Sequence, residues 1–179
     1  RKVCEGELRQ VMSKAEYDIT EEEYLTIIEN KSATLFGISC RLGAMLSGAA
    51  QQQTEMFEQF GTEAGVAFQI NDDLADIINM ENPADKTCGS DIRDRKPTLP
   101  LIHLLATAAP ADRIQILNML KDPEFEFSKS PLMEMLHTSG SLEYTKFVVR
   151  DRLQKAAEHL SPLSDSPAKR ALLNIHNCF

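Results

Sequence analysis

The chain has 179 residues, of which 42% are hydrophobic and 26% charged, a composition that suits one globular domain and excludes a disordered tail. Its 27 acidic side chains outnumber its 19 lysines and arginines, which gives a formal net charge of −8. Because such a surface repels phosphate backbones, we expect no nucleic-acid partner. No apolar run approaches the roughly 20 residues of a membrane span, so we expect no transmembrane segment.

The N-terminus and the cysteines indicate a cytoplasmic protein. The first residues, from Arg1 on, lack the apolar core of a signal peptide. The four cysteines are widely separated and form no Cys-x-x-Cys motif, so neither a zinc site nor a redox pair is expected. Reduced cytoplasmic thiols are therefore the better interpretation.

Helix signals dominate the chain, and strand signals are almost absent, so we predict an all-α protein of about seven helices. A short helix is expected near 4–14. Thr20 and Glu23 form a capping-box pattern that begins a long helix, with apolar and small residues as far as about 48. Another long helix is expected over 54–79, and further helices near 97–108, 111–121, 131–139, 141–160 and from 167 on.

A polar segment, 80–96, separates the helix at 54–79 from the next one. It contains Pro83, Gly89 and several charged residues, and we predict a loop. A loop of this length inside a compact domain is usually functional or disordered. This segment is therefore a candidate part of a binding site.

Three carboxylates stand close together on the predicted helix 54–79. Asp72 and Asp76 are four residues apart, Asp73 and Asp76 are three apart, and Gln69 lies on the same face. Like charges on one turn destabilise a helix unless a cation lies between them. Mg²⁺ prefers one or two carboxylates together with substrate phosphates, so this face is a candidate magnesium site. A solvated acidic helix face is the alternative.

Basic residues on two segments complete the candidate site. Lys31 and Ser32 lie among small residues of the helix that begins near 20, where a lysine either reaches solvent or binds phosphate beside a hydroxyl donor. Lys86 and Lys96 lie in the segment 80–96. That segment is either a solvated mixed-charge loop or a loop that closes over a metal-bound polyphosphate.

Several motifs follow one another along the chain. They are Glu5-Gly6-Glu7-x-x-Gln10, Lys31-Ser32, Gly65-x-Ala67-Phe68-Gln69-Ile70-x-Asp72-Asp73-x-x-Asp76, and Lys86-x-x-Gly89-x-Asp91-x-x-x-x-Lys96-x-Thr98-Leu99-Pro100. In their order and spacing the chain resembles the trans-prenyltransferases, the polyprenyl diphosphate synthases, and most of all their medium- and long-chain members. The resemblance extends over nearly the whole chain.

The resemblance implies a fold and a reaction. The fold is the all-α isoprenoid synthase-type helical bundle, as a single domain over 1–179 and in a homodimer. The reaction is the Mg²⁺-dependent head-to-tail condensation of isopentenyl diphosphate with an allylic diphosphate. Metal and lysine charges act on the diphosphate leaving group, and apolar walls protect the allylic cation from water.

The resemblance also assigns roles to residues. Magnesium binding falls to Asp72, Asp73 and Asp76, and catalysis to Asp72, Asp73 and Lys31. Substrate contact is implied for Lys31, Ser32, Phe68, Gln69, Lys86 and Lys96. Ser32 replaces the usual threonine, and Arg95 stands where glycine is common.

The first aspartate-rich motif of this family is missing from the 179 residues. The chain therefore resembles the C-terminal part of such an enzyme with the N-terminal half absent, and we expect it to be inactive alone. The alternatives are a non-catalytic partner subunit of a heteromeric synthase and an unrelated helical binding module. The intact aspartates and lysines argue against the first alternative, and the coincidence of several ordered motifs argues against the second.

Overall fold

The computed structural model describes residues 1–13, 19–79, 91, 94, 96–122, 125 and 131–175. Within these ranges the protein is all-helical, as predicted, and no helix is long and apolar enough to cross a membrane. The helices are α1 (Lys2–Ser13), α2 (Glu21–Ile28), the π-helical turn η1 (Glu29–Ala33), α3 (Thr34–Leu46), α4 (Gln51–Ile78), α6 (Leu99–Thr107), α7 (Pro110–Lys121), α8 (Leu132–Thr138), α9 (Ser141–Leu160) and α10 (Pro167–Leu173).

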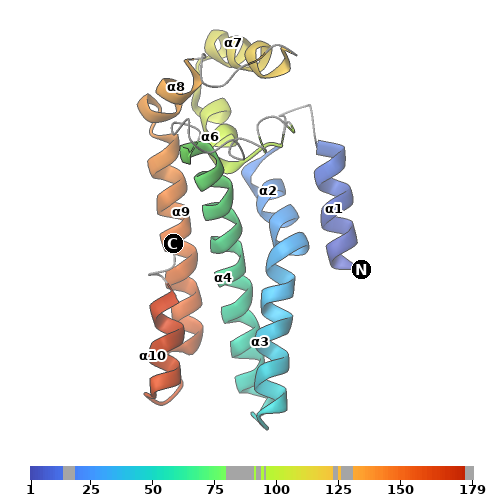
Figure 1. Ribbon diagram of the computed structural model, residues 1–179, viewed down its shortest axis with the longest axis vertical. Helices are drawn as coiled ribbons and strands as arrows, with labels where there is room; N and C mark the ends of the chain where they lie inside the picture. Colours follow the sequence, from blue (N-terminus) through green and yellow to red (C-terminus); the bar gives the residue numbers. More distant parts are fainter. Residues whose placement is uncertain are drawn as a thin grey trace.

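Helix α4 is the central element of an elongated bundle (Figure 1). It packs along α3 on one side and along α9 on the other, while α1 lies against η1. The short helices α6, α7 and α8 lie together at one end of the bundle. Ile70 and Ile77 of α4 are completely buried, in two different apolar clusters. The predicted acidic helix is therefore a core helix that exposes only part of its surface.

Glycines of α1 and α4 permit close contacts with η1. A Cβ atom on Gly65 of α4 would lie 2.7 Å from the Cα atom of Ala33. A Cβ atom on Gly6 of α1 would lie 2.7 Å from the backbone nitrogen of Lys31. Both distances are shorter than atoms tolerate, so α1 and α4 can approach η1 only because these residues are glycines.

The long helix predicted from 20 to 48 is interrupted. Thr20 and Glu23 form the predicted capping box: the Thr20 hydroxyl accepts from the Glu23 backbone N–H, and the Glu23 carboxylate accepts from the Thr20 backbone N–H. After α2, however, residues 29–33 form a π-helical turn before α3 begins. Such turns occur frequently at functional sites, and this one contains Lys31 and Ser32. The other described helices begin and end within three residues of the prediction.

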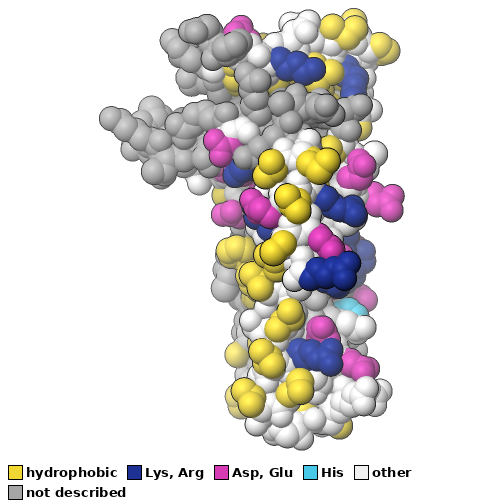
Figure 2. Space-filling model, turned by 90° about the vertical axis from the view of Figure 1, so that its right-hand side faces the viewer, with side chains coloured by type: hydrophobic (Ala, Val, Ile, Leu, Met, Phe, Trp, Pro, Cys, Tyr) yellow, Lys and Arg dark blue, Asp and Glu magenta, His cyan; other side chains and the backbone are white. Residues whose placement is uncertain are grey.

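Apolar side chains are exposed along one face of the bundle (Figure 2). They belong to α1 and α3 and include Leu8, Val11, Met12, Leu35, Ile38, Leu42, Met45 and Leu46. Leu46 is the most exposed of them, at 89%. A contiguous apolar surface of this kind usually marks an interface.

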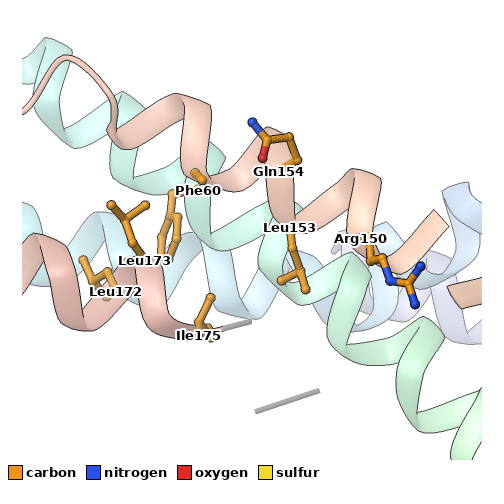
Figure 3. Close-up of a pocket in the computed structure, with 8 residues that line it drawn as sticks. Phe60, Arg150, Leu153, Gln154, Leu172, Leu173 and Ile175 are labelled. Atoms are coloured by element: carbon orange, nitrogen blue, oxygen red, sulfur yellow. The ribbon is translucent and has the colours of Figure 1, made fainter. Parts of the chain in front are cut away.

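A small apolar pocket lies on the side of α4 that faces α9 and α10. It has a volume of about 200 Å³ and is enclosed by α4, α9 and α10. Phe60 lies beside Leu172 and Leu173, while the Arg150 guanidinium points away from them (Figure 3). None of the described candidate site residues lines this pocket.

Candidate active site

A cleft of about 260 Å³ lies between α1, α2 with η1, α4 and the segment that precedes α6. Most of the predicted site residues meet here. The lining consists of Gln10, Ile28, Lys31, Ser32, Gln69, Asp72, Asp73, Asp91, Lys96, Pro97 and Thr98. The structure thus brings together residues that are as far apart as 31 and 96 in the sequence.

Asp73 is the buried carboxylate of the cleft, and its side chain is held in place from both sides. The Tyr24 hydroxyl donates to Oδ2 at 2.7 Å, and Gln69 Nε2 donates to Oδ1 at 2.9 Å. Burial raises the pKa of Asp73 to about 7, although both hydrogen bonds act in the opposite direction. Burial also raises the pKa of Tyr24 well above its usual value, so this hydroxyl stays a donor.

Asp72 differs from Asp73 in its surroundings. It is exposed and lies at the cleft, whereas Asp73 is only 7% exposed. Because both oxygens of Asp73 already accept hydrogen bonds, Asp72 is the carboxylate that is open to a ligand. One turn later, Asp76 Oδ2 accepts from the backbone N–H of Asp91 at 3.0 Å.

Ser32 and Gln69 join η1 to α4. The Ser32 hydroxyl donates to Gln69 Oε1 at 2.7 Å, and the Gln69 amide in turn donates to Asp73. This chain of hydrogen bonds runs from a hydroxyl at the cleft to the buried carboxylate. It fixes which end of the Gln69 amide faces each neighbour.

Lys31 is held by α1. Its Nζ lies 2.9 Å from Glu7 Oε2 and also donates to Gln10 Oε1. The Lys31 side chain is 33% exposed, so its ammonium remains accessible from the cleft. Both partners come from the predicted Glu-x-x-Gln segment, which the close approach at Gly6 brings next to η1.

Lys96 lies across the cleft and is paired with Asp91. Its Nζ is 2.5 Å from Asp91 Oδ1, and its backbone N–H donates to the Asp91 carbonyl oxygen at 2.8 Å. Burial lowers the pKa of Lys96, but the hydrogen bond and charge of Asp91 outweigh burial, so the pKa is raised overall. Lys96 therefore stays positively charged.

Two predicted substrate contacts are not among the residues that line the cleft in the described part of the chain. Phe68 does not line the cleft; it is 46% exposed, and its ring centroid lies 5.3 Å from that of Phe36 on α3. Lys86 lies outside the described residues, as does most of the segment 80–96, which was expected to be either a solvated loop or a loop that closes over a ligand. The roles of both residues stay predictions.

Some residues of the site carry roles that the sequence did not reveal. Tyr24 carries no sequence motif, but a buried tyrosine hydroxyl usually has a hydrogen-bond partner, and this rule points to a contact such as the one with Asp73. Gln10, Asp91 and Thr98 belong to the quoted motifs without an assigned role. The Thr98 side chain is 1% exposed, and its Oγ1 atom has no hydrogen-bond partner in the part of the chain that is described.

The cleft can hold a cation only together with a further ligand. Among the described residues, no group of three or more His, Cys, Asp or Glu side chains could hold a metal ion. One accessible carboxylate beside two ammonium groups instead suits an ion that phosphate oxygens and water complete. The chemistry of the cleft therefore fits a magnesium–diphosphate pair.

Comparison with known proteins agrees with the motifs. Residues 1–136 match the family described as polyprenyl synthetase. The short chain isoprenyl diphosphate synthase of Methanothermobacter thermautotrophicus is 33% identical over 174 residues, which are 97% of this chain and 53% of the relative. A decaprenyl diphosphate synthase from Rhodobacter capsulatus has a TM-score of 0.89 at 29% identity, over 99% of this chain and 55% of that structure.

A polyprenyl synthase from Caulobacter crescentus, whose structure is complexed with calcium and isoprenyl diphosphate, has a TM-score of 0.86 at 28% identity. The match covers 98% of this chain and 54% of that structure. The chain thus spans about half the length of the relatives that it matches.

Proposed function

Because this chain belongs to the polyprenyl synthetase family, we propose that it is part of a polyprenyl diphosphate synthase, which joins isopentenyl diphosphate head-to-tail to an allylic diphosphate. The observation that carries this proposal is the cleft, in which the Lys31 and Lys96 ammonium groups lie with the open carboxylate of Asp72. Cations and a metal-binding carboxylate are the groups that a diphosphate leaving group requires.

Asp72, which is open at the cleft, is the first of the proposed magnesium ligands. Asp73 and Asp76, to which the resemblance also assigns metal binding, lie on the same face of α4. Bound Mg²⁺ supplies positive charge that neutralises the diphosphate as its bond to the allylic carbon breaks. The Tyr24 and Gln69 hydrogen bonds keep Asp73 from turning toward solvent. The acidic face of α4 thereby keeps one geometry before the ligand arrives.

Lys31 and Lys96 are the proposed diphosphate ligands. Each ammonium is paired with a carboxylate at the edge of the cleft, Lys31 with Glu7 and Lys96 with Asp91. A diphosphate carries more negative charge than one carboxylate, so it competes for both ammonium groups. The Ser32 hydroxyl and the Gln69 amide line the same cleft as uncharged hydrogen-bonding groups.

The proposed enzyme needs a second half. The chain spans about half the length of its relatives, and the apolar stripe of α1 and α3 is exposed to solvent (Figure 2). We propose that the complementing half covers part of this stripe and completes the metal site, and that the assembled enzyme is a cytoplasmic homodimer. The chain alone would then bind diphosphate without joining prenyl units.

Calorimetric titration tests the proposal. Inorganic diphosphate is added to the chain with Mg²⁺ and, separately, with EDTA. We expect saturable binding only with Mg²⁺, lost in Asp72→Ala and retained in Asp112→Ala, an exposed aspartate of α7 that does not line the cleft. Binding that is equal in both variants would mean that Asp72 belongs to a solvated helix face.

A further inference from the structure

The Thr98 hydroxyl is a buried polar group at the cleft. Its side chain is 1% exposed, and within the described part of the protein its Oγ1 atom makes no hydrogen bond. Thr98 is also the N-cap residue of α6, yet its side chain accepts no bond from the first turn of that helix. Threonine at this position normally accepts one, and an unpaired buried hydroxyl destabilises the folded protein. Within the described residues this hydroxyl therefore contributes no hydrogen bond.

The place of Thr98 suggests what its hydroxyl binds. Thr98 lines the cleft next to Pro97 and Lys96, and α6 begins at the following residue. The N-terminus of a helix carries partial positive charge and favours anions. Two independent features, an unpaired donor and a helix N-terminus, thus meet at one corner of the cleft.

The charges around the cleft indicate the class of ligand. Asp72, Asp73 and Asp91 oppose a free anion, while Lys31 and Lys96 attract one. An anion that arrives with a divalent cation satisfies both sets of groups. A phosphate oxygen of such a pair can accept a hydrogen bond from a neutral hydroxyl as well as from the ammonium groups.

We propose that the Thr98 hydroxyl donates a hydrogen bond to a phosphate oxygen of the diphosphate in the cleft, at the N-terminus of α6. The inference rests on the proposed function and adds a diphosphate ligand to it. The unpaired hydroxyl lowers the stability of the ligand-free chain and gains its partner when diphosphate binds. Thr98 is accordingly a residue that favours ligand affinity over stability.

Two variants test whether the Thr98 hydroxyl binds diphosphate or caps α6. Thr98→Val keeps the shape and removes the hydroxyl, and Thr98→Ser keeps the hydroxyl. Inorganic diphosphate is titrated into each variant with Mg²⁺, and the thermal unfolding of each is measured without ligand. We expect Thr98→Val to bind about tenfold more weakly and Thr98→Ser within about twofold of the parent chain, since a hydrogen bond to a charged group is lost only in the first. Ligand-free Thr98→Val should unfold at the same or a higher temperature.

Two outcomes would overturn the inference. Equal diphosphate affinity of Thr98→Val and the parent chain would show that the hydroxyl does not bind the diphosphate. A ligand-free unfolding temperature clearly lower for Thr98→Val than for Thr98→Ser would show that the hydroxyl acts as a helix cap. Asp72→Ala separates the two proposals: if it abolishes binding while Thr98→Val does not weaken it, only the inference about Thr98 fails. Absence of Mg²⁺-dependent binding in the parent chain would overturn both.

Discussion

The buried carboxylate of Asp73 makes the stability of the protein depend on pH in a way that one substitution can test. Burial raises its pKa to about 7, against 3.8 for an ordinary aspartate. The folded chain therefore holds a proton on Asp73 that the unfolded chain releases above about pH 4. Asp73→Asn removes the titrating group and keeps its size.

Proton linkage gives the sign and the size of the change in the free energy of unfolding with pH. A carboxyl whose pKa is raised by folding contributes most stability below the pKa of the unfolded chain, and this contribution is lost as the pH rises to the pKa of the folded protein. Between about pH 4.5 and pH 6.5, this carboxyl alone lowers the free energy of unfolding by about 1.4 kcal/mol per pH unit. The difference in stability between the parent chain and Asp73→Asn should change with this slope.

Urea unfolding of both proteins at several pH values provides the test. Because all other titrating groups are shared, the difference between the two free energies isolates Asp73. We expect the parent chain to lose stability relative to Asp73→Asn as the pH rises from 4.5 to 6.5. A difference that is independent of pH, or that changes in the opposite direction, would refute the assignment of Asp73 as a buried carboxyl with a raised pKa.

Three further predictions concern packing and activity. Gly65→Ala should destabilise the chain by about 1–3 kcal/mol in urea unfolding because its Cβ would clash with Ala33; Gly43→Ala, whose Cβ meets open space, is the control, and equal effects would disprove the close contact. Lys31→Met should weaken Mg²⁺-dependent diphosphate binding at least about tenfold, while Lys155→Met on α9 should bind with unchanged affinity. Equal affinities of the two variants would show that Lys31 does not bind diphosphate. The chain alone, given both prenyl substrates and Mg²⁺, should form no elongated product, and product above background would show that one aspartate cluster suffices.

Local patterns were sufficient to predict the helices and to indicate part of the candidate site. The capping box of Thr20 and Glu23 acts within one helical turn. The acidic face at Asp72 and Asp73 is likewise a property of a single helix. That this acidic face lies near Lys31, Ser32 and Lys96 was implied only by the family resemblance, because no local pattern predicts which distant segments lie side by side.

The features that were not predicted depend on tertiary packing. The π-helical turn at 29–33 has no distinct local signal, and it forms where α1 and α4 press closely against the chain. The hydrogen bond between Tyr24 and Asp73 joins residues 49 positions apart. The unused hydroxyl of Thr98 is visible only when the first turn of α6 and the cleft are seen together.

The central claim is that the open carboxylate of the cleft acts on a metal-bound diphosphate. It is tested most directly by the turnover of a full-length synthase that contains this chain, with Asp72→Ala compared with Asp112→Ala under saturating Mg²⁺. Our account predicts that Asp72→Ala lowers kcat by at least ~10²-fold with the fold intact, because a group that acts on transition-state charge is lost. Asp112→Ala should leave kcat unchanged. Turnover of Asp72→Ala close to that of the parent enzyme would contradict the account.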